Sequence, residues 1–409
     1  MKLAIIFYSI FISFNLFAHG PASSISGSDS ERKIIFPDLE DRITIISDLH
    51  THSVFSDGHV WPNIRVEEAI RDGLDLIAVT EHLEYQPHID DIPHPDRNKS
   101  FIEAKAAAKK KDIIVINGSE ITRENPPGHI NAVFINDANK LMSIDYEKTQ
   151  EANNYIADLP EDIKETYQDE SWFMDLILAN LWPPIEALKE AKKQGGFTFW
   201  NHPASPDQSN KGISILSDLH REMISLDLLD GIEVVNGNWY SEEAFEIALE
   251  HDLTLIGTSD VHDLIEWDYP LKDNQHRPVT LIFSKERTAE SIRVALSEDR
   301  TAIWWKNTVI AKPRNMQPLL KAAISILSAD YLEETSVMEV ILKNKSDVGF
   351  QLKNILKQTF QNTENIIFLP PQGEISIQIN DYNKKSKHYL KFEVLNALTA
   401  PRENPIIVL

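Results

Sequence analysis

The sequence predicts an α/β protein in which a closed β/α barrel with a helical insertion precedes a small β-domain. Between residues 41 and 312, short apolar runs alternate with amphipathic segments of helical composition. Strands that alternate with helices form parallel sheets, and about seven or eight such units suit a closed barrel better than an open sheet. After residue 313 the pattern changes to short alternating runs between turn-rich pieces such as Pro370–Gly373, which is typical of antiparallel β-structure.

The N-terminal segment is expected to lie outside the folded domains. Lys2 precedes an apolar run from Leu3 to Phe17, and a polar stretch rich in Gly and Ser follows. This pattern predicts a secretory signal peptide over residues 1–19 and a linker over residues 20–40. The apolar run is shorter than the roughly 20 residues that cross a bilayer. We therefore expect an exported protein, periplasmic or secreted, with no stable membrane anchor.

The elements of the barrel follow in order along the chain. Apolar runs predict strands at Ile43–Ser47, Asp75–Thr80, Asp112–Asn117, His129–Ile135, Gly196–Asn201, Asp230–Asn236, Leu253–Thr258 and Pro278–Ser284. Helices are predicted at Glu67–Asp72, Phe101–Lys110, Pro184–Gln194, Ser217–Leu229, Glu242–Glu250 and Thr288–Ser297. The acidic segment 140–182, rich in Tyr and Trp, is longer than a crossover requires and is predicted to be a helical insertion.

Residues 313–409 are predicted to form a small β-sandwich-like domain. Its strands are expected at Val337–Lys343, Gln351–Leu356, Glu374–Ile379 and Tyr389–Val394. This part of the chain holds almost no candidate catalytic groups, so we expect it to have a supporting or partner-facing role.

The composition restricts the chemistry that the chain can perform. It has 409 residues, 14 histidines and no cysteine, which excludes disulfides, thiolate zinc sites and cysteine nucleophiles. The formal net charge of −23 argues against nucleic acid as the main partner. The sequence contains no GxGxxG or GxxxxGK[ST] loop, so the commonest nucleotide-binding motifs are also excluded.

Histidines and carboxylates gather where the predicted strands end. Residues two apart in an extended chain point to the same side, so His50 and His52 can reach one metal ion. The ends of barrel strands converge on one mouth, and a shared metal site is therefore predicted there. His129 opens its strand instead of closing it and fits this rule less well. The other groups are Thr80-Glu81-His82, Gly118-Ser119-Glu120, Asn201-His202-Pro203 and Ser259-Asp260-Val261-His262.

These motifs resemble the PHP (polymerase and histidinol phosphatase) superfamily of metal-dependent phosphoesterases. The resemblance covers residues 43–307 and rests on DLHTHSVFSDG, AVTEH, the glutamate of NGSEIT, GHI, NHP and SDVHD. The segments EYQPHIDDIPHPDRN, GSEITRENPPGHINAVF and HRPVTLIFSKERTAESI, with the leader, look most like an exported organophosphate phosphodiesterase branch. The resemblance implies a distorted, TIM-like (β/α)7 barrel.

The resemblance also implies nine ligands for two or three divalent ions. Mixed nitrogen and oxygen ligands suit Mn²⁺, Zn²⁺ or Fe²⁺ better than Mg²⁺ or Ca²⁺. His50, His52 and Asp260 would bind a first ion, Glu120 would bridge it to a second ion completed by His129 and His202, and Asp57, His82 and His262 would hold a third.

The expected reaction is hydrolysis of a small phosphoester, most simply a phosphodiester, by in-line attack of a hydroxide that bridges two ions. Glu120, His262 and Arg123 are the predicted catalytic residues. Arg123 would clamp a phosphate oxygen as a fork-shaped donor, or else pair with Glu124 or another carboxylate. His88 and His94 would line the substrate entrance or protonate the leaving group, or else be solvated loop residues. Glu81 is expected to orient a ligand histidine.

Several alternatives stay open at this point. Phosphomonoesters and phosphotriesters can be hydrolysed at the same kind of site. An amidohydrolase-type barrel also begins with HxH, but it normally has a bridging lysine at the fourth strand, where this chain has His129. A secreted metal-binding or ligand-binding module without activity is the alternative outside the enzymes.

Overall fold

A computed structural model describes residues 33–92, 95–167, 169–206, 208–209, 211–270, 275–380 and 389–409. The predicted signal peptide, most of the predicted linker and His94 lie outside the described residues. Among the described residues, no helix has both the length and the apolar character needed to span a bilayer.

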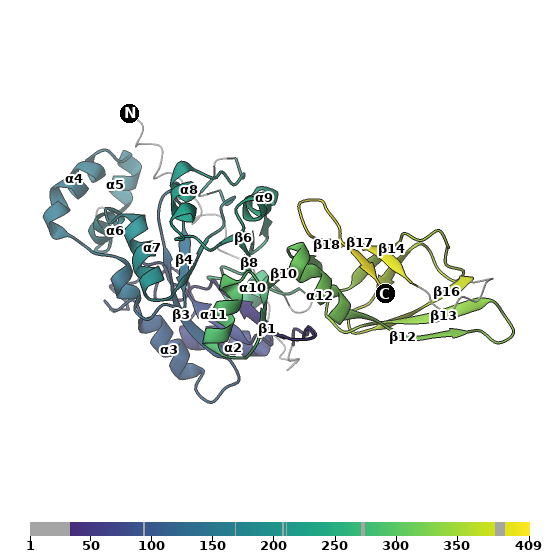
Figure 1. Ribbon diagram of the computed structural model, residues 1–409. Coiled ribbons are helices and arrows are strands. Elements are labelled where there is room, and N and C mark those ends of the chain that lie inside the picture. The colour runs from purple at the N-terminus through teal and green to yellow at the C-terminus, as the bar shows by residue number, and fades with distance from the viewer. Residues whose placement is uncertain are drawn as a thin grey trace.

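The predicted distorted barrel is confirmed as a curled mixed sheet with helices packed around it (Figure 1). Most neighbouring barrel strands are parallel, but β4 runs antiparallel to both β3 and β5. The N-terminal end of β4 therefore lies beside the C-terminal ends of its neighbours. The barrel strands are β1 (Ile43–Asp48), β2 (Leu76–Val79), β3 (Ile114–Ile121), β4 (Ile130–Val133), β5 (Phe197–Trp200), β6 (Gly231–Asn236) and β8 (Thr254–Thr258).

Further strands extend this sheet at both edges. β9 (Val279–Ser284) pairs antiparallel with β1, and β10 (Thr301–Trp305) and β11 (Thr308–Ile310) follow it outward. The short β7 (Trp239–Tyr240) forms a hairpin with β6. β9 forms the ladder with the outer edge of β1, so β8 does not pair with β1 in the described part of the chain. Instead, side-chain hydroxyl groups of β9 and β10 form hydrogen bonds to the backbone of β8. Thr280 Oγ1 bonds to both N and O of Gly257 at 2.9 and 2.8 Å, and Thr301 Oγ1 donates to the Leu255 carbonyl at 2.9 Å.

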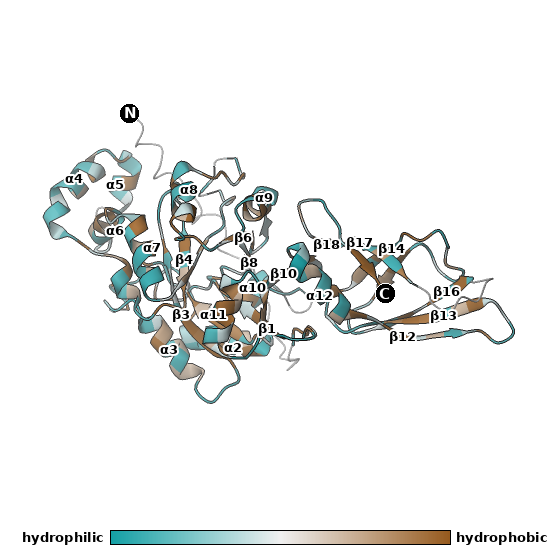
Figure 2. Ribbon diagram, viewed as in Figure 1, coloured by the Kyte–Doolittle hydropathy of each residue, from teal (hydrophilic) through white to brown (hydrophobic). Residues whose placement is uncertain are grey.

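Helices cover the outside of the sheet and begin at recognisable signals. Proline occupies the first turn of α2 and α7, and Ser217, Ser241 and Thr288 cap α8, α9 and α11 with their hydroxyl groups. Figure 2 shows hydrophobic colour on strands such as β4 and hydrophilic colour over much of helices such as α4 and α7. The helices are α2 (Pro62–Arg71), α3 (Lys99–Ala107), α7 (Pro184–Lys193), α8 (Asp218–Ser225), α9 (Glu242–Glu250), α10 (Ile265–Asp268) and α11 (Ala289–Ser297).

The segment predicted to be an insertion is helical. Its side chains form an apolar cluster of their own, which includes Trp172, Phe173 and Leu176 and packs against Tyr85 and Ile89. It therefore lies over the loop that follows β2. The insertion contains η2 (Ala138–Leu141), η3 (Tyr146–Lys148), α4 (Thr149–Ala157), α5 (Glu161–Tyr167) and α6 (Phe173–Asn180).

The C-terminal part contains two small antiparallel sheets, with strand orders β12-β13-β16 and β15-β14-β17-β19. Two features differ from the prediction. Residues 313–323 form the helix α12, whose apolar face packs into the same core as the strands, and β18 pairs in parallel with β11 of the barrel sheet. The elements are α12 (Pro313–Ala323), β12 (Ile324–Tyr331), β13 (Val337–Asn344), β14 (Phe350–Asn354), β15 (Ile366–Leu369), β16 (Glu374–Asn380), β17 (Lys391–Val394), β18 (Ala397–Leu398) and β19 (Ile406–Val408).

An apolar plug fills the barrel below its mouth. Its fully buried side chains include Ile45, Leu76, Phe199 and Ile256, one each from β1, β2, β5 and β8. The polar side chains of the mouth therefore lie directly above a close-packed apolar core, which holds the strand ends in place.

β8 packs closely against β10 at Gly257. A Cβ atom at this position would lie 2.3 Å from Cγ2 of the buried Ile303. We expect Gly257→Ala to lower the free energy of unfolding by about 1–3 kcal/mol through overpacking, measured by urea denaturation. In the double variant with Ile303→Ala the loss should be smaller than the sum of the single losses. Strictly additive losses would contradict the proposed clash.

Candidate metal centre

The structure brings all nine sequence-predicted ligands together at the mouth of the barrel. They form four overlapping clusters, and the possible ligand atoms within each cluster lie within 4.8 Å of one another. The antiparallel direction of β4 explains why His129 precedes its strand, because the start of β4 lies at the mouth. The clusters are His52/Asp57/His82/His262, His50/His52/Glu120, His50/His202/Asp260 and His82/Glu120/His129.

Glu120 lies at the centre of these clusters and is fully buried. Its Oε1 atom is 3.1 Å from His129 Nδ1 and 3.2 Å from His202 Nε2. Its Oε2 atom is 2.8 Å from His82 Nδ1 and 3.4 Å from His52 Nε2. The two carboxylate oxygens therefore face different histidines, an arrangement that suits a ligand shared by two ions.

The ligands of the β1 and β8 loops point at a common position. His50 Nε2 and His52 Nε2 are 3.0 Å apart, and each is 3.1 Å from Asp260 Oδ1. Asp260 and His202 have positive φ angles, +52° and +25°. Backbone conformations of this kind cluster at functional sites because the surrounding structure must hold them.

The residues present fit divalent ions. Asp57 Oδ1, Glu120 Oε2 and Asp260 Oδ1 are buried and accept no hydrogen bond among the described residues. Buried carboxylate oxygens are costly unless a cation compensates them, and imidazole nitrogens lie beside each of the three. Three carboxylates and six histidines form the mixed donor set that suits Mn²⁺, Zn²⁺ or Fe²⁺.

The electrostatics of the ligands support the same conclusion. Burial disfavours the charged form of His262, but the carboxylate of Asp57 outweighs it and raises the pKa to about 9. Burial together with the neighbouring His262 and His82 lowers the pKa of His52 to about 3. Burial opposes ionisation of Glu120, yet the adjacent imidazoles hold its pKa well below the usual range. Without metal, protons on the histidines compensate the carboxylates.

Residues 48–180 match the PHP domain, and residues 324–409 match an Ig-like domain. The chain is 33% identical to a two-domain protein from Bacteroides vulgatus ATCC 8482 that contains a predicted PHP-like metal-dependent phosphoesterase. The match covers 94% of this chain and 99% of that one, with a TM-score of 0.77. The chain belongs to the PHP family.

Other similar structures are more distant from this PHP protein. An amidohydrolase from Chromobacterium violaceum, with bound sulfate and no metal, is 21% identical, with 56% of this chain and 90% of that one covered and a TM-score of 0.37. PsfC from Pseudomonas syringae PB-5123 is 13% identical, with 68% and 96% covered and a TM-score of 0.38. No curated protein matches the chain.

A buried glutamate that the sequence analysis missed supports the PHP ligands from below. Glu233, which is 1% exposed, accepts from His50 Nδ1 at 2.9 Å and from the backbone N–H of His202 at 2.7 Å. It also accepts from Asn236 Nδ2, which lies 3.2 Å from Asp260 Oδ2. A carboxylate at Nδ1 directs Nε2 of the same imidazole towards a metal. The only sequence signal was an acidic residue inside a buried strand.

Glu81 has the orienting role that the sequence predicts. Its carboxylate accepts hydrogen bonds from the backbone N–H of Ser53 at 3.0 Å and from Ser56 Oγ at 2.6 Å. Ser56 Oγ lies 3.3 Å from His52 Nδ1. Glu81 therefore fixes the loop after β1, which carries His52 and Asp57.

The structure favours the alternative role of Arg123. Its side chain is 5% exposed and forms an ion pair with Glu84, while Glu124 accepts a hydrogen bond from Tyr155 instead. The guanidinium also donates to the carbonyls of Ala179 and Trp182 at 3.4 and 3.3 Å. Arg123 thus holds the insertion to the barrel, and the structure gives no support for a clamp on substrate phosphate.

His88 lies close to the mouth, although nothing in the structure tests its predicted role. Its ring centroid is 6.5 Å from that of His59, whose Nδ1 is 2.7 Å from Asp263 Oδ1. Asp263 follows the ligand His262 directly. A function of His88 at the substrate entrance stays a prediction.

Metal binding to this centre should release protons. His262, with a pKa of about 9, is protonated at pH 7 in the metal-free protein, so an ion must displace its proton. His262 should therefore make metal affinity rise with pH up to about pH 9, whereas His52, already neutral, should contribute no proton. Against the effect of burial, neighbouring carboxylates also hold the pKa of His50 and of His82 well above the usual range, so these imidazoles should release protons as well. Calorimetric titration in buffers of different ionisation enthalpy measures the released protons.

The variant His262→Ala should release fewer protons than the natural protein. The matched control, His251→Ala, changes a histidine at the end of α9 and should leave the number unchanged. A proton release equal in all three proteins would contradict the assignment.

Proposed function

We propose that this PHP protein is a metal-dependent phosphoesterase that hydrolyses a small phosphodiester. The observation that carries the proposal is Glu120, a buried carboxylate shared by two possible metal clusters, His50/His52/Glu120 and His82/Glu120/His129. Divalent ions held at such a pair of sites polarise phosphoryl oxygens and lower the pKa of water towards neutrality. The phosphoesterase domain of the similar Bacteroides protein supports the same class of reaction.

The protein's own residues hold and orient these ions. Glu233 bonds directly to His50 Nδ1, and Glu81 acts on His52 Nδ1 through the hydroxyl of Ser56, so that the Nε2 atoms face the mouth. The rigid strand ends keep the ligand atoms in place before substrate arrives. Preorganisation of this kind removes the cost of rearranging charged groups during the reaction.

The arginines beside the ligand loops favour a diester over a monoester. Arg65 and Arg123 are buried, and their guanidinium groups are bonded to protein carbonyls and glutamates. Arg97 is half-buried and donates through Nε to the carbonyl of Leu83, next to the ligand His82, at 2.8 Å. Arg65 and Arg123 are therefore not free to neutralise the second negative charge of a phosphomonoester.

The insertion limits the size of the substrate. It lies over the loop after β2, where the rings of Tyr85 and Trp172 are 5.1 Å apart and Ser171 Oγ donates to Asp90 at 2.8 Å. Tyr85 in turn lies edge-on to the ligand His82, with 6.0 Å between the ring centroids. The predicted leader further supports hydrolysis outside the cytoplasm by an enzyme of the exported phosphodiesterase branch.

The proposal is tested with residues 20–409, stripped of metal and reconstituted with Mn²⁺, Zn²⁺ or Fe²⁺. Nitrophenyl phosphomonoesters, diesters and triesters and a nitroanilide amide are compared under identical conditions. We expect the diester to be hydrolysed fastest, and chelation to abolish turnover. Glu120→Gln should lower kcat/KM by at least about 100-fold, because one bridging charge is lost.

Glu290→Gln is the matched control, because Glu290 is an exposed glutamate on α11 that pairs with Arg293. Its activity should equal that of the natural protein. Turnover that persists after complete metal removal, or full activity of Glu120→Gln, would exclude the proposed mechanism. Faster hydrolysis of the amide would favour the amidohydrolase alternative, and metal binding without any turnover would favour a binding module.

A further inference from the structure

Among the described residues, the first and last strands of the barrel, β1 and β8, share no strand ladder. Among the described residues, β8 has a ladder with β6, whereas β1 has ladders with β2 and β9. The loops beyond β1 and β8 nevertheless join. Thr51 and Val261 form an isolated bridge, His52 N donates to the Val261 carbonyl at 3.1 Å, and Asp260 N donates to the His50 carbonyl at 3.0 Å. We call this junction, residues 50–52 and 260–263, the seam.

The seam divides the metal ligands into two groups. Asp260 and His262 lie on its β8 side, and the other seven ligands come from elsewhere in the barrel. Two of the clusters, His52/Asp57/His82/His262 and His50/His202/Asp260, include a ligand from the β8 side. The two clusters that contain Glu120 do not. The geometry of the first two therefore depends on the width of the seam.

Arg65, from α2, spans this seam with its guanidinium group and is 2% exposed. On the β1 side, Nε donates to the His52 carbonyl at 2.8 Å. On the β8 side, Nη1 donates to the Asp263 carbonyl and Nη2 to the His262 carbonyl, both at 2.6 Å, with a longer bond from Nη2 to Val261 at 3.3 Å. One planar group thus bonds to both ligand loops, beside the backbone hydrogen bonds that join them.

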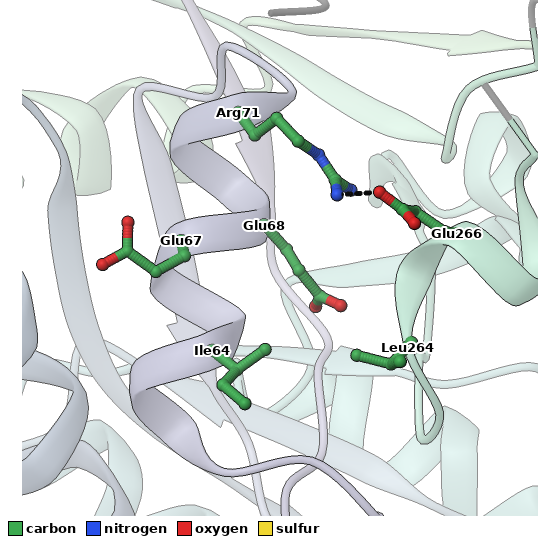
Figure 3. Close-up of a pocket in the computed structure, with 6 residues that line it drawn as sticks. All are labelled: Ile64, Glu67, Glu68, Arg71, Leu264 and Glu266. Carbon is green, nitrogen blue, oxygen red and sulfur yellow. Dashed lines mark hydrogen bonds and ion pairs between the residues drawn. The ribbon is translucent and has the colours of Figure 1, made fainter. Parts of the chain in front are cut away.

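The rest of α2 holds the β8 side in the same way. Glu68 accepts from Arg65 Nη1 at 2.8 Å and from the Ile265 N–H at 2.9 Å. One turn further, Arg71 forms an ion pair with Glu266. Figure 3 shows Glu68 and Arg71 directed from the helix towards the segment with Leu264 and Glu266, across a cleft of about 320 Å³. Residues three apart on a helix share a face, so α2 presents one continuous surface to the loop after β8.

We infer that Arg65 is a positioning residue that sets the spacing across the seam and thereby supports the two seam-spanning metal clusters selectively. The inference rests on the metal-dependent function proposed above. A lysine keeps the charge but lacks the rigid fork that reaches several carbonyls at once. The chain's own geometry thus assigns Arg65 a role in metal binding through the backbone carbonyls of the ligand residues His52 and His262.

The test is Arg65→Lys in the full mature chain, titrated with Co²⁺ while the visible absorption of the bound ion is recorded. We expect the affinity of the seam-spanning sites to fall by about 10- to 100-fold, as for other residues that support metal ligands. The cluster His82/Glu120/His129, which contains no seam residue, should bind as in the natural protein, and the cobalt spectrum should change in shape. Excess metal should restore hydrolysis.

Arg293→Lys is the control, because Arg293 forms an ordinary pair with Glu290 on the same helix, α11. It should leave all affinities and the spectrum unchanged. Equal affinities and an identical spectrum in Arg65→Lys would overturn the inference, and so would a uniform loss at every site.

Thermal unfolding of the metal-free proteins separates this effect from misfolding. If Arg65→Lys does not fold, Glu68→Gln replaces it, because it retains the carbonyl contacts of Arg65 but removes the charge that holds the guanidinium. Glu68→Gln should lower the Co²⁺ affinity less than Arg65→Lys does, and only at the seam-spanning sites. An unchanged affinity, or an equal decrease at every site, would overturn the inference. Binding is measured without substrate, so failure to hydrolyse any phosphoester would reject the proposed function alone.

Discussion

The burial of Glu120 is the constraint on which the whole site depends. A carboxylate without solvent is stable only if positive charge surrounds it. Five imidazoles lie within 3.5 Å of its oxygens, from His50, His52, His82, His129 and His202. These come from the ends of four different strands, β1, β2, β4 and β5, so the barrel must bring them together for the carboxylate to remain buried. Either protons on the imidazoles or metal ions can supply the positive charge that compensates the carboxylate. Because a metal ion displaces these protons, metal binding depends on pH.

The antiparallel direction of β4 allows Glu120 and His129, which are close in sequence, to lie together at the mouth. In a uniformly parallel barrel, a strand brings its last residues to the mouth. Because β4 runs antiparallel to β3 and β5, it reaches the mouth with its beginning, and a short loop suffices between Glu120 and His129. Two ligands nine residues apart thus lie 3.1 Å apart. The same reversal makes the barrel a distorted one.

The ligands could be predicted from sequence because each follows an apolar run, and strand direction then places it at the mouth. The residues that support them could not. Glu233 lies inside a buried strand and Arg65 on an amphipathic helix, and neither position differs locally from an ordinary strand or helix residue. Their roles depend on contacts across 183 and 198 residues of sequence. At Arg123, proximity to Glu120 in sequence suggested either a substrate contact or an ion pair, and the structure shows an ion pair with Glu84.

The β-domain shows a similar limit. Its strands alternate clearly, but α12 was missed because it begins with Pro313 at the apparent domain boundary, and Pro318 lies within it. β18 has only two residues and is defined by its pairing with β11, a contact that no local pattern encodes. The Ig-like domain and the barrel therefore share a sheet.

The position of the seam has a consequence for biosynthesis. Arg65 emerges from the ribosome early, together with His50 and His52, but three of its four carbonyl partners belong to residues 261–263. A nascent chain that ends before β8 carries most of the histidines, and its Arg65 has only the partners His52 and Glu68 among those described above. It lacks the loop that completes the seam. The full metal centre is thus a property of the finished barrel, and ions acquired during translation would meet only its Glu120-centred half.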